Sequence, residues 1–133
     1  MDRLRAPFLS DVEPGSLSLI SVYIGLHHTT EADRAPYVRS LHRALGAGGK
    51  VIIRDHDVRD DEFRHLVALA HDVFNVGTGE IWATTERERR NFYSLDTLAT
   101  LFENEDFFAE GPRLVQAGDP TKNTLLCFVK SRA

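Results

Sequence analysis

Apolar residues along the chain gather in short runs that alternate with segments of helical period. Residues 16–25 (SLSLISVYIG) are rich in Leu, Ile, Val and Tyr without a helical period, which predicts a buried strand. In residues 30–45 the apolar positions recur every three or four residues, which predicts a helix. Thr30 is the expected N-cap of that helix, and Pro36 indicates that its regular part begins near Pro36.

The middle of the chain repeats this alternation. Residues 46–49 (GAGG) are expected to end the first helix, and residues 51–53 (VII) to form a second short buried strand. Residues 60–75 have acidic residues at the start and then a broad apolar face, which predicts a second helix packed through that face. The residues of this face are Phe63, Leu66, Val67, Leu69, Ala70 and Phe74.

The last third begins with a charged segment, residues 81–93 (IWATTERERRNFY), which predicts a loop or a frayed helix end. Ser94 is the expected cap of a short helix that follows it. The apolar runs at residues 112–118 and 123–130 predict two strands joined by a turn, and hence a hairpin. The order of elements predicts an α/β fold, with a mostly parallel sheet, one antiparallel strand in the C-terminal hairpin, and flanking helices.

Length and composition indicate one globular domain. The chain has 133 residues, of which 42% are hydrophobic and 27% charged, and this length is enough for a substantial core. We expect residues 1–15 to form an N-terminal arm and residues 16–133 a single domain. The formal net charge of -4 disfavours binding to nucleic acid or to an anionic membrane.

Cysteine content and hydropathy indicate a cytoplasmic protein. The single cysteine, Cys127, lies inside an apolar run, so we expect it to pack in the core. A single cysteine rules out an internal disulfide and agrees with a reducing compartment. No apolar stretch approaches the roughly 18 residues of a membrane span, and residues 1–15 lack the apolar segment of a secretory signal.

Polar residues that could carry chemistry follow both buried strands. His27 and His28 come after the first strand, and residues 54–57 (RDHD) after the second. Parallel strands end at the same edge of a sheet, where such folds bind ligands, so these side chains should converge. They could bind a substrate, orient a general base or ligate a metal. Alternatively, His27 packs inward, His28 caps the turn or faces water, and residues 54–57 only form ion pairs and helix caps.

Three segments together resemble the C-terminal half of a class I, Rossmann-like, S-adenosylmethionine-dependent methyltransferase. They are residues 19–58 (LISVYIGLHHTTEADRAPYVRSLHRALGAGGKVIIRDHDV), 93–107 (YSLDTLATLFENEDF) and 123–130 (NTLLCFVK). They look like the fourth strand with its LHH loop, the helix and glycine-rich turn before the fifth strand, the segment before the sixth strand, and a reversed seventh strand.

The resemblance implies S-adenosylmethionine as cofactor and assigns roles to individual residues. Because the LHH loop borders the reactive methyl group in this family, catalytic roles fall to His27, His28, Asp55 and His56. The substrate-binding candidates are Arg54, Asp57, Trp82 and Tyr93, and the cofactor-side candidates are Gly25 and Leu26. No metal ligand is implied. Trp82 and Tyr93 could form a lid over the pocket, or they could be core residues.

The glycine-rich turn and the acidic residue that hold the cofactor in this family are absent from the chain. Two functions follow: a fragment or subunit of a methyltransferase completed by a cofactor-binding half, or a non-catalytic interaction or small-ligand module. Whether the chain is an enzyme stays open. Since an unpaired strand edge is normally covered, we expect a partner on the first strand: a second copy, a separate chain or the arm at residues 1–13.

A metal-dependent hydrolase is a third reading. It rests on His71 and Asp72 placed beside His27, His28 and Asp57. His65 and His71 are six residues apart and therefore lie on different helix faces, so the spacing disfavours this reading.

Overall fold

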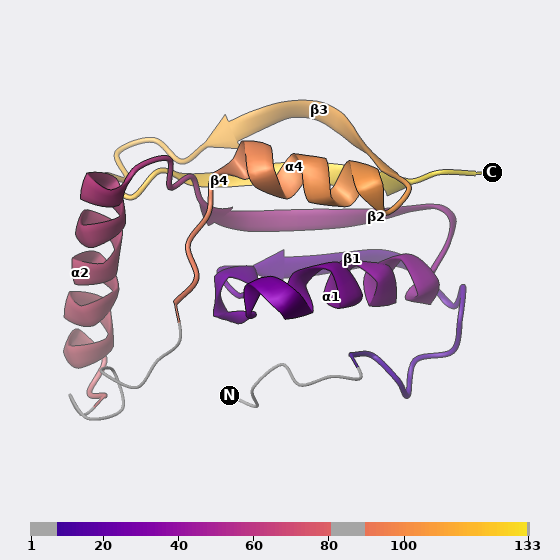
Figure 1. The fold of residues 1–133 in the computed structure, drawn as a ribbon, viewed down its shortest axis with the longest axis horizontal. Helices are drawn as coiled ribbons and strands as arrows, with labels where there is room; N and C mark the ends of the chain where they lie inside the picture. Colours follow the sequence, from indigo (N-terminus) through magenta and orange to yellow (C-terminus); the bar gives the residue numbers. More distant parts are fainter. Residues whose placement is uncertain (1–7, 81–89, 133) are drawn as a thin grey trace.

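The computed structural model describes residues 8–80 and 90–132 and has the α/β order that the sequence predicts (Figure 1). The elements are β1 (Leu17–Tyr23), η1 (Leu26–His28), α1 (Glu31–Ala44), β2 (Leu45–His56), α2 (Asp61–Gly77), α4 (Leu95–Asn104), β3 (Phe107–Val115) and β4 (Asn123–Lys130). Trp82 falls outside the described residues.

The strands form one sheet in the order β1-β2-β4-β3. β1 and β2 are parallel, whereas β4 is antiparallel to both of its neighbours. β4 is therefore the reversed last strand, and the predicted hairpin is confirmed. Its first strand begins at Phe107, earlier than predicted, because the chain continues past an irregularity in register between Glu110 and Leu114.

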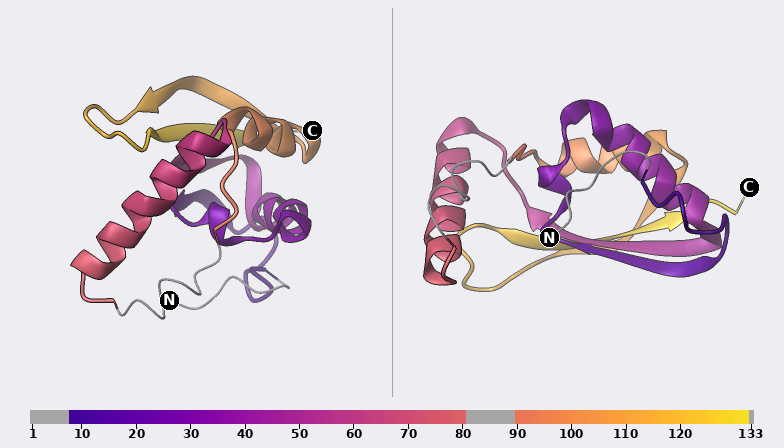
Figure 2. Two further views of the ribbon diagram at one scale, coloured as in Figure 1. Left: turned by 60° about the vertical axis from the view of Figure 1, so that its left-hand side comes forward. Right: turned by 90° about the horizontal axis from the view of Figure 1, so that it is seen from below.

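Helices α1 and α4 cover one face of the sheet, as the right-hand view of Figure 2 shows. The core lies between these helices and the sheet, where Phe102 of α4 stacks on Phe128 of β4 with ring centroids 4.2 Å apart. Leu41 of α1 and Ile53 of β2 are almost fully buried in the same cluster. Residues 8–15 run along α1, where the Phe8 ring packs against the Tyr37 ring at 5.1 Å.

The opposite face of the sheet carries no helix of the described ranges (Figure 2). The prediction of a buried first strand is therefore wrong: four of the seven residues of β1 are exposed, among them Leu19 and Tyr23 at 54% and 56%, and the other three are partly buried. The prediction for Cys127 is also wrong. Its neighbours Leu126 and Phe128 point into the core, so Cys127 lies partly exposed on the uncovered face.

The first helix differs from the prediction at both ends. It begins at Glu31 rather than near Pro36, because the Thr30 hydroxyl accepts the backbone N–H of Asp33 and caps the helix. The glycine run at residues 46–49 belongs to β2 rather than to a separate turn. It forms an irregular stretch where the pairing with β1 shifts, and Gly48 has a φ of +72° that favours glycine.

Helix α2 stands at the ends of β1 and β2, apart from the other helices (Figure 1). It begins after the Asp60 cap as predicted, but its apolar face is not packed against the domain. Val67 is the one residue of this helix that is fully buried, whereas Leu69 and Phe74 are 59% and 69% exposed. Within residues 8–80 and 90–132, no helix is long and apolar enough to cross a membrane.

Candidate functional site

The two predicted polar loops meet where β1 and β2 end. After Tyr23, Ile24 adopts a φ of +50° and donates its N–H to the Arg54 carbonyl at 2.7 Å. The chain then turns into η1, which carries His27 beside the end of β2. His27 Nδ1 lies 2.8 Å from Asp55 Oδ1, which confirms that the two loops converge.

His27, Asp55 and Tyr93 form a buried chain of hydrogen bonds. The Tyr93 hydroxyl donates to Asp55 Oδ2 at 2.6 Å, and the His56 N–H donates to Asp55 Oδ1 at 2.9 Å. Burial alone raises the pKa of Asp55, but the hydrogen bonds from His27, Tyr93 and His56 outweigh it and hold the pKa below its ordinary value. Asp55 is thus a carboxylate inside the core. Burial, together with the Asp55 charge, raises the pKa of Tyr93 well above its ordinary value, so Tyr93 stays a hydrogen-bond donor.

The Asp55 carboxylate fixes the tautomer of His27. A carboxylate can only accept, so His27 Nδ1 carries the proton of this hydrogen bond. In the neutral ring, Nε2 then presents a lone pair. Nε2 is buried and has no hydrogen-bond partner among the described residues. His27 is therefore a buried base, oriented through Nδ1 and unsatisfied at Nε2.

A second pair of histidines lies beside this base. His56 Nδ1 is 3.1 Å from the Thr121 carbonyl, so it donates there, and His56 Nε2 lies 2.9 Å from His71 Nε2 on α2. Since His56 Nε2 is then the acceptor in the neutral ring, His71 donates through Nε2. Burial lowers the pKa of His56. The helical period correctly separates His71 from the exposed His65, but only the placement of α2 shows that His71 faces His56.

Residues 90–93, the strap, run across this cluster. The Asn91 N–H donates to the His27 carbonyl at 2.7 Å, and its side-chain amide donates to the Thr29 carbonyl at 2.8 Å. Arg34 of α1 donates to the Asn91 carbonyl, and its guanidinium stacks on the Tyr93 ring at 4.5 Å. The strap is thereby fixed to both η1 and α1.

The strap also holds α2. Arg90 donates to the Ala68 carbonyl at 3.0 Å and to the Asp72 carboxylate at 2.6 Å. From the helix side, Arg64 donates to the Phe92 carbonyl at 2.9 Å. The Phe92 ring covers the histidines, with its centroid 4.9 Å from that of His27 and 5.5 Å from that of His71. His27 is consequently fully buried beneath the strap and α2.

Several predicted residues lie elsewhere or have other contacts. The Arg54 side chain donates to Gln116 on the β3–β4 side of the sheet rather than to its neighbour Asp55. Asp57 accepts the Leu95 N–H at 3.0 Å and so supports the start of α4, while Asp60 caps α2. The His28 ring lies 4.2 Å from the His27 ring.

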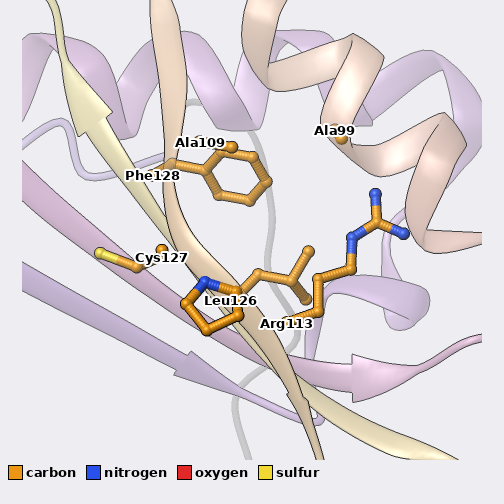
Figure 3. Close-up of a pocket in the computed structure, with 8 residues that line it drawn as sticks. Ala99, Ala109, Arg113, Leu126, Cys127 and Phe128 are labelled. Atoms are coloured by element: carbon orange, nitrogen blue, oxygen red, sulfur yellow. The ribbon is translucent and has the colours of Figure 1, made fainter.

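The cofactor-side candidates, Gly25 and Leu26, lie at the start of η1. Leu26 is fully buried in the core, and a Cβ on Gly25 would make only ordinary contacts, at 3.6 Å to Val22 and 3.8 Å to the Tyr23 carbonyl. A cavity of about 70 Å³ lies between α4 and the β3–β4 hairpin (Figure 3). Arg113 and Phe128 line it, and no residue of the His27 cluster does. Among the described residues, no three histidine, cysteine or acidic side chains are grouped to hold a metal ion.

Comparison with known proteins identifies methyltransferases. No family model matches the chain. An uncharacterized methyltransferase of Geobacillus thermodenitrificans is 29% identical over 120 residues, which cover 84% of this chain and 51% of that protein. A second uncharacterized methyltransferase, from Geobacillus kaustophilus, is 28% identical over the same shares. The chain therefore spans about half the length of the curated relatives it matches.

Solved methyltransferase structures share the fold. A SAM-dependent methyltransferase from Methanosarcina mazei superposes with a TM-score of 0.63 at 11% identity, over 97% of this chain and 66% of that one. An O-methyltransferase family protein from Burkholderia thailandensis gives 0.65 at 12% identity, over 98% and 34%. The 1,6-didemethyltoxoflavin-N1-methyltransferase of the same organism, solved with S-adenosylhomocysteine, gives 0.60 at 14% identity, over 96% and 50%. The chain therefore has the fold of class I methyltransferases and is similar to about half of the curated methyltransferases that it matches.

Proposed function

We propose that this chain supplies the acceptor-side half of an S-adenosylmethionine-dependent methyltransferase, with His27 as its general base. The observation that carries the proposal is the buried His27–Asp55 pair at the ends of β1 and β2. Ligands bind at this edge of open α/β sheets. The solved relative with bound S-adenosylhomocysteine supports the choice of cofactor.

The hydrogen-bond chain suits methylation of an acceptor that loses a proton. When a hydroxyl group is methylated, a bond forms from its oxygen to the methyl carbon, the bond from that carbon to sulfur breaks, and the hydroxyl proton must leave. His27 Nε2 carries the lone pair that can take this proton. The Asp55 carboxylate stabilises the resulting imidazolium, and the Tyr93 hydroxyl fixes the carboxylate. Tyr93 then acts as a positioning residue rather than as a substrate contact.

The described residues do not by themselves form a site for S-adenosylmethionine. When bound, this cofactor would supply the methyl group. Neither Gly25 nor Leu26 provides a close approach for it, and the chain lacks the glycine-rich turn of the family. Most of the cofactor contacts must therefore come from another polypeptide segment. The curated relatives, about twice as long as the matched region, agree with this division.

The free edge of β1 is the place where we propose that a partner binds. β1 pairs only with β2 in the described ranges, and residues 8–15 run along α1 rather than beside β1. We propose that the cofactor half covers this edge in the complete enzyme and that a second copy covers it when the chain is alone. A cytoplasmic location is part of the proposal, and the unpaired thiol of Cys127 agrees with it.

Calorimetric titration with S-adenosylhomocysteine tests the division of the site. The samples are this chain alone and a chimera in which it replaces the matched region of the Geobacillus thermodenitrificans relative. We expect binding to the chimera and none to the chain alone. Micromolar binding to the chain alone would show that the cofactor site is not divided. A folded chimera without binding, beside an intact relative that binds, would favour the non-catalytic module.

A further inference from the structure

We propose that α2 is a lid over His27, latched by the hydrogen bond between His56 and His71 and released when this pair takes up protons. The lid rests on the proposed function only in that His27 is taken as the reacting base. A general base must reach its substrate, yet His27 is fully buried, with the rings of His71 and Phe92 against it. The described arrangement is therefore the closed state of the site.

The attachment of α2 is small and mostly polar. Its apolar part is a cluster of Val58, Val67 and Phe92, with Phe63 and Ala68 packed against it. Among the described residues its other contacts include hydrogen bonds to the strap, the bond from His71 to His56, and the Lys122 ammonium over the Phe63 ring at 5.1 Å. Elements that bury little apolar surface open at low cost in free energy. Helix α2 can thus open while the main core, built by α1, α4 and the sheet, stays folded.

The latch responds to pH because of its geometry. His56 already donates through Nδ1 to the Thr121 carbonyl, so its Nε2 must accept from His71. If both rings are protonated, two N–H groups face each other across 2.9 Å and the hydrogen bond is lost. A single added proton places a positive charge in the buried pair, and burial disfavours the charged form of His56. Protonation therefore favours the open state.

Charged and titratable groups from several elements face the latch. Asp55 of β2 and Asp119 of the β3–β4 turn both have a lowered pKa, because hydrogen bonds to each carboxylate outweigh burial. Asp72 is ion-paired with Arg90. On η1, the His27 ring lies 5.9 Å from the His56 ring and 5.1 Å from the His71 ring, and the His28 ring lies 4.2 Å from that of His27.

The sign of the effect follows from linkage. The pKa of His56 is lowered in the closed state, whereas in an open state it returns toward the ordinary value of about 6.5. The open state therefore binds more protons below about pH 6.5, and acidification shifts the equilibrium toward it. Above that range both states hold a neutral ring, and the lid is fully latched.

Hydrogen exchange of the whole chain at about pH 7.5 and about pH 5.5, on either side of the ordinary histidine pKa, tests the proposal. After correction for intrinsic exchange, we expect residues 61–77 to exchange faster at the lower pH, by up to about tenfold for one histidine whose pKa returns to about 6.5 in the open state. Residues 31–44 of α1 should not change. The proposal is overturned if α2 and α1 respond alike.

Substitutions separate the latch from a general effect of acid. In His71→Gln the amide can either donate to His56 or accept from it, so protection of α2 should depend less on pH than in the wild type. His65→Gln alters an exposed histidine of the same helix and should behave like the wild type. A wild-type pH response in His71→Gln would refute the latch. If that variant does not fold, the wild type still tests the latch: NMR gives the pH at which the His56 and His71 rings take up protons. The exchange of α2 must accelerate over the same pH range. No cofactor enters these measurements, so the lid and the methyltransferase proposal can fail separately.

Discussion

At the scale of residues, Asp55 controls the candidate site. It lies 1% exposed and accepts from a histidine ring, a tyrosine hydroxyl and a backbone N–H. A buried carboxylate of this kind is stable only while its donors remain, since an unpaired buried charge costs several kcal/mol. The same donors keep His27 and Tyr93 in place, so the three groups form one structural unit.

Removing the Asp55 carboxylate should destabilise the fold. We expect Asp55→Ala to lower the free energy of unfolding by about 3 kcal/mol, because His27 Nδ1 and the Tyr93 hydroxyl lose their buried acceptor. Asp61→Ala removes a 94% exposed carboxylate and should change it by less than about 0.5 kcal/mol. Urea unfolding at neutral pH measures both. Equal, small effects would mean that the buried chain of hydrogen bonds does not form.

The pH dependence of Asp55 has a definite sign. Its pKa is lowered in the folded chain, so between that value and the ordinary pKa of 3.8 the unfolded chain binds more protons. The stabilisation is present above pH 3.8 and is lost as pH falls through the folded pKa. Asp55→Asn cannot titrate. We therefore expect the stability gap between wild type and Asp55→Asn, measured by urea unfolding, to shrink on acidification. A gap independent of pH would contradict the lowered pKa.

The sequence was sufficient to predict that His27 and Asp55 lie close together, because each follows a strand whose pattern is clear, and parallel strands end at the same edge of the sheet. It was not sufficient to predict that Tyr93 and His71 lie beside them. Tyr93 is placed by the strap, whose path depends on Arg34, Arg64 and Asn91 rather than on any periodic pattern. His71 depends on which face of α2 turns toward the domain, and the apolar pattern indicates the wrong one.

At the scale of elements, α2 differs from an ordinary surface helix because most of its apolar side chains face solvent. Leu66, Leu69, Val73 and Val76 are spaced by three and four residues and are 47%, 59%, 66% and 50% exposed. The side of α2 that contacts the domain carries Arg64 and His71, with Val67 from the border of the predicted apolar face. Periodicity identifies an apolar face but not what that face contacts. Buried polar contacts at the site, rather than apolar area, decide how α2 is oriented.

A substitution on the side of α2 that contacts the domain should therefore lower the free energy of unfolding more than a substitution on its exposed apolar side. Val67→Ala deletes fully buried methyl groups and should lower the free energy of unfolding by about 1.5–3 kcal/mol. Leu69→Lys replaces an exposed leucine in a helix and should change it by less than about 0.5 kcal/mol. Urea unfolding followed by circular dichroism compares them. A larger loss in Leu69→Lys than in Val67→Ala would show that α2 packs through its apolar face after all.

At the scale of the whole molecule, the sheet is open on one face and at one edge. Parallel strands are normally covered on both faces, and the sequence pattern of β1 was read in that way. The pattern could give the order of the elements and the reversed last strand, because these depend on local turns and apolar runs. It could not show what covers β1, because the apolar pattern of a strand does not identify its neighbour. The exposed Leu19 and Tyr23 on β1 are the consequence.

Self-association through β1 is the property that tests this view of the molecule. Light scattering coupled to size exclusion should find the isolated chain dimeric at concentrations of tens of micromolar, a usual range for a modest interface. Leu19→Lys with Tyr23→Lys places charges beside the free edge of β1 and should yield a monomer, because such charges oppose strand pairing. Leu69→Lys, which charges the exposed face of α2, serves as the matched control and should leave the dimer intact. If Leu69→Lys dissociates the dimer and the β1 variant does not, α2 is the interface. A monomeric wild type would remove the second copy as a partner and leave the cofactor half as the only proposed occupant of the edge.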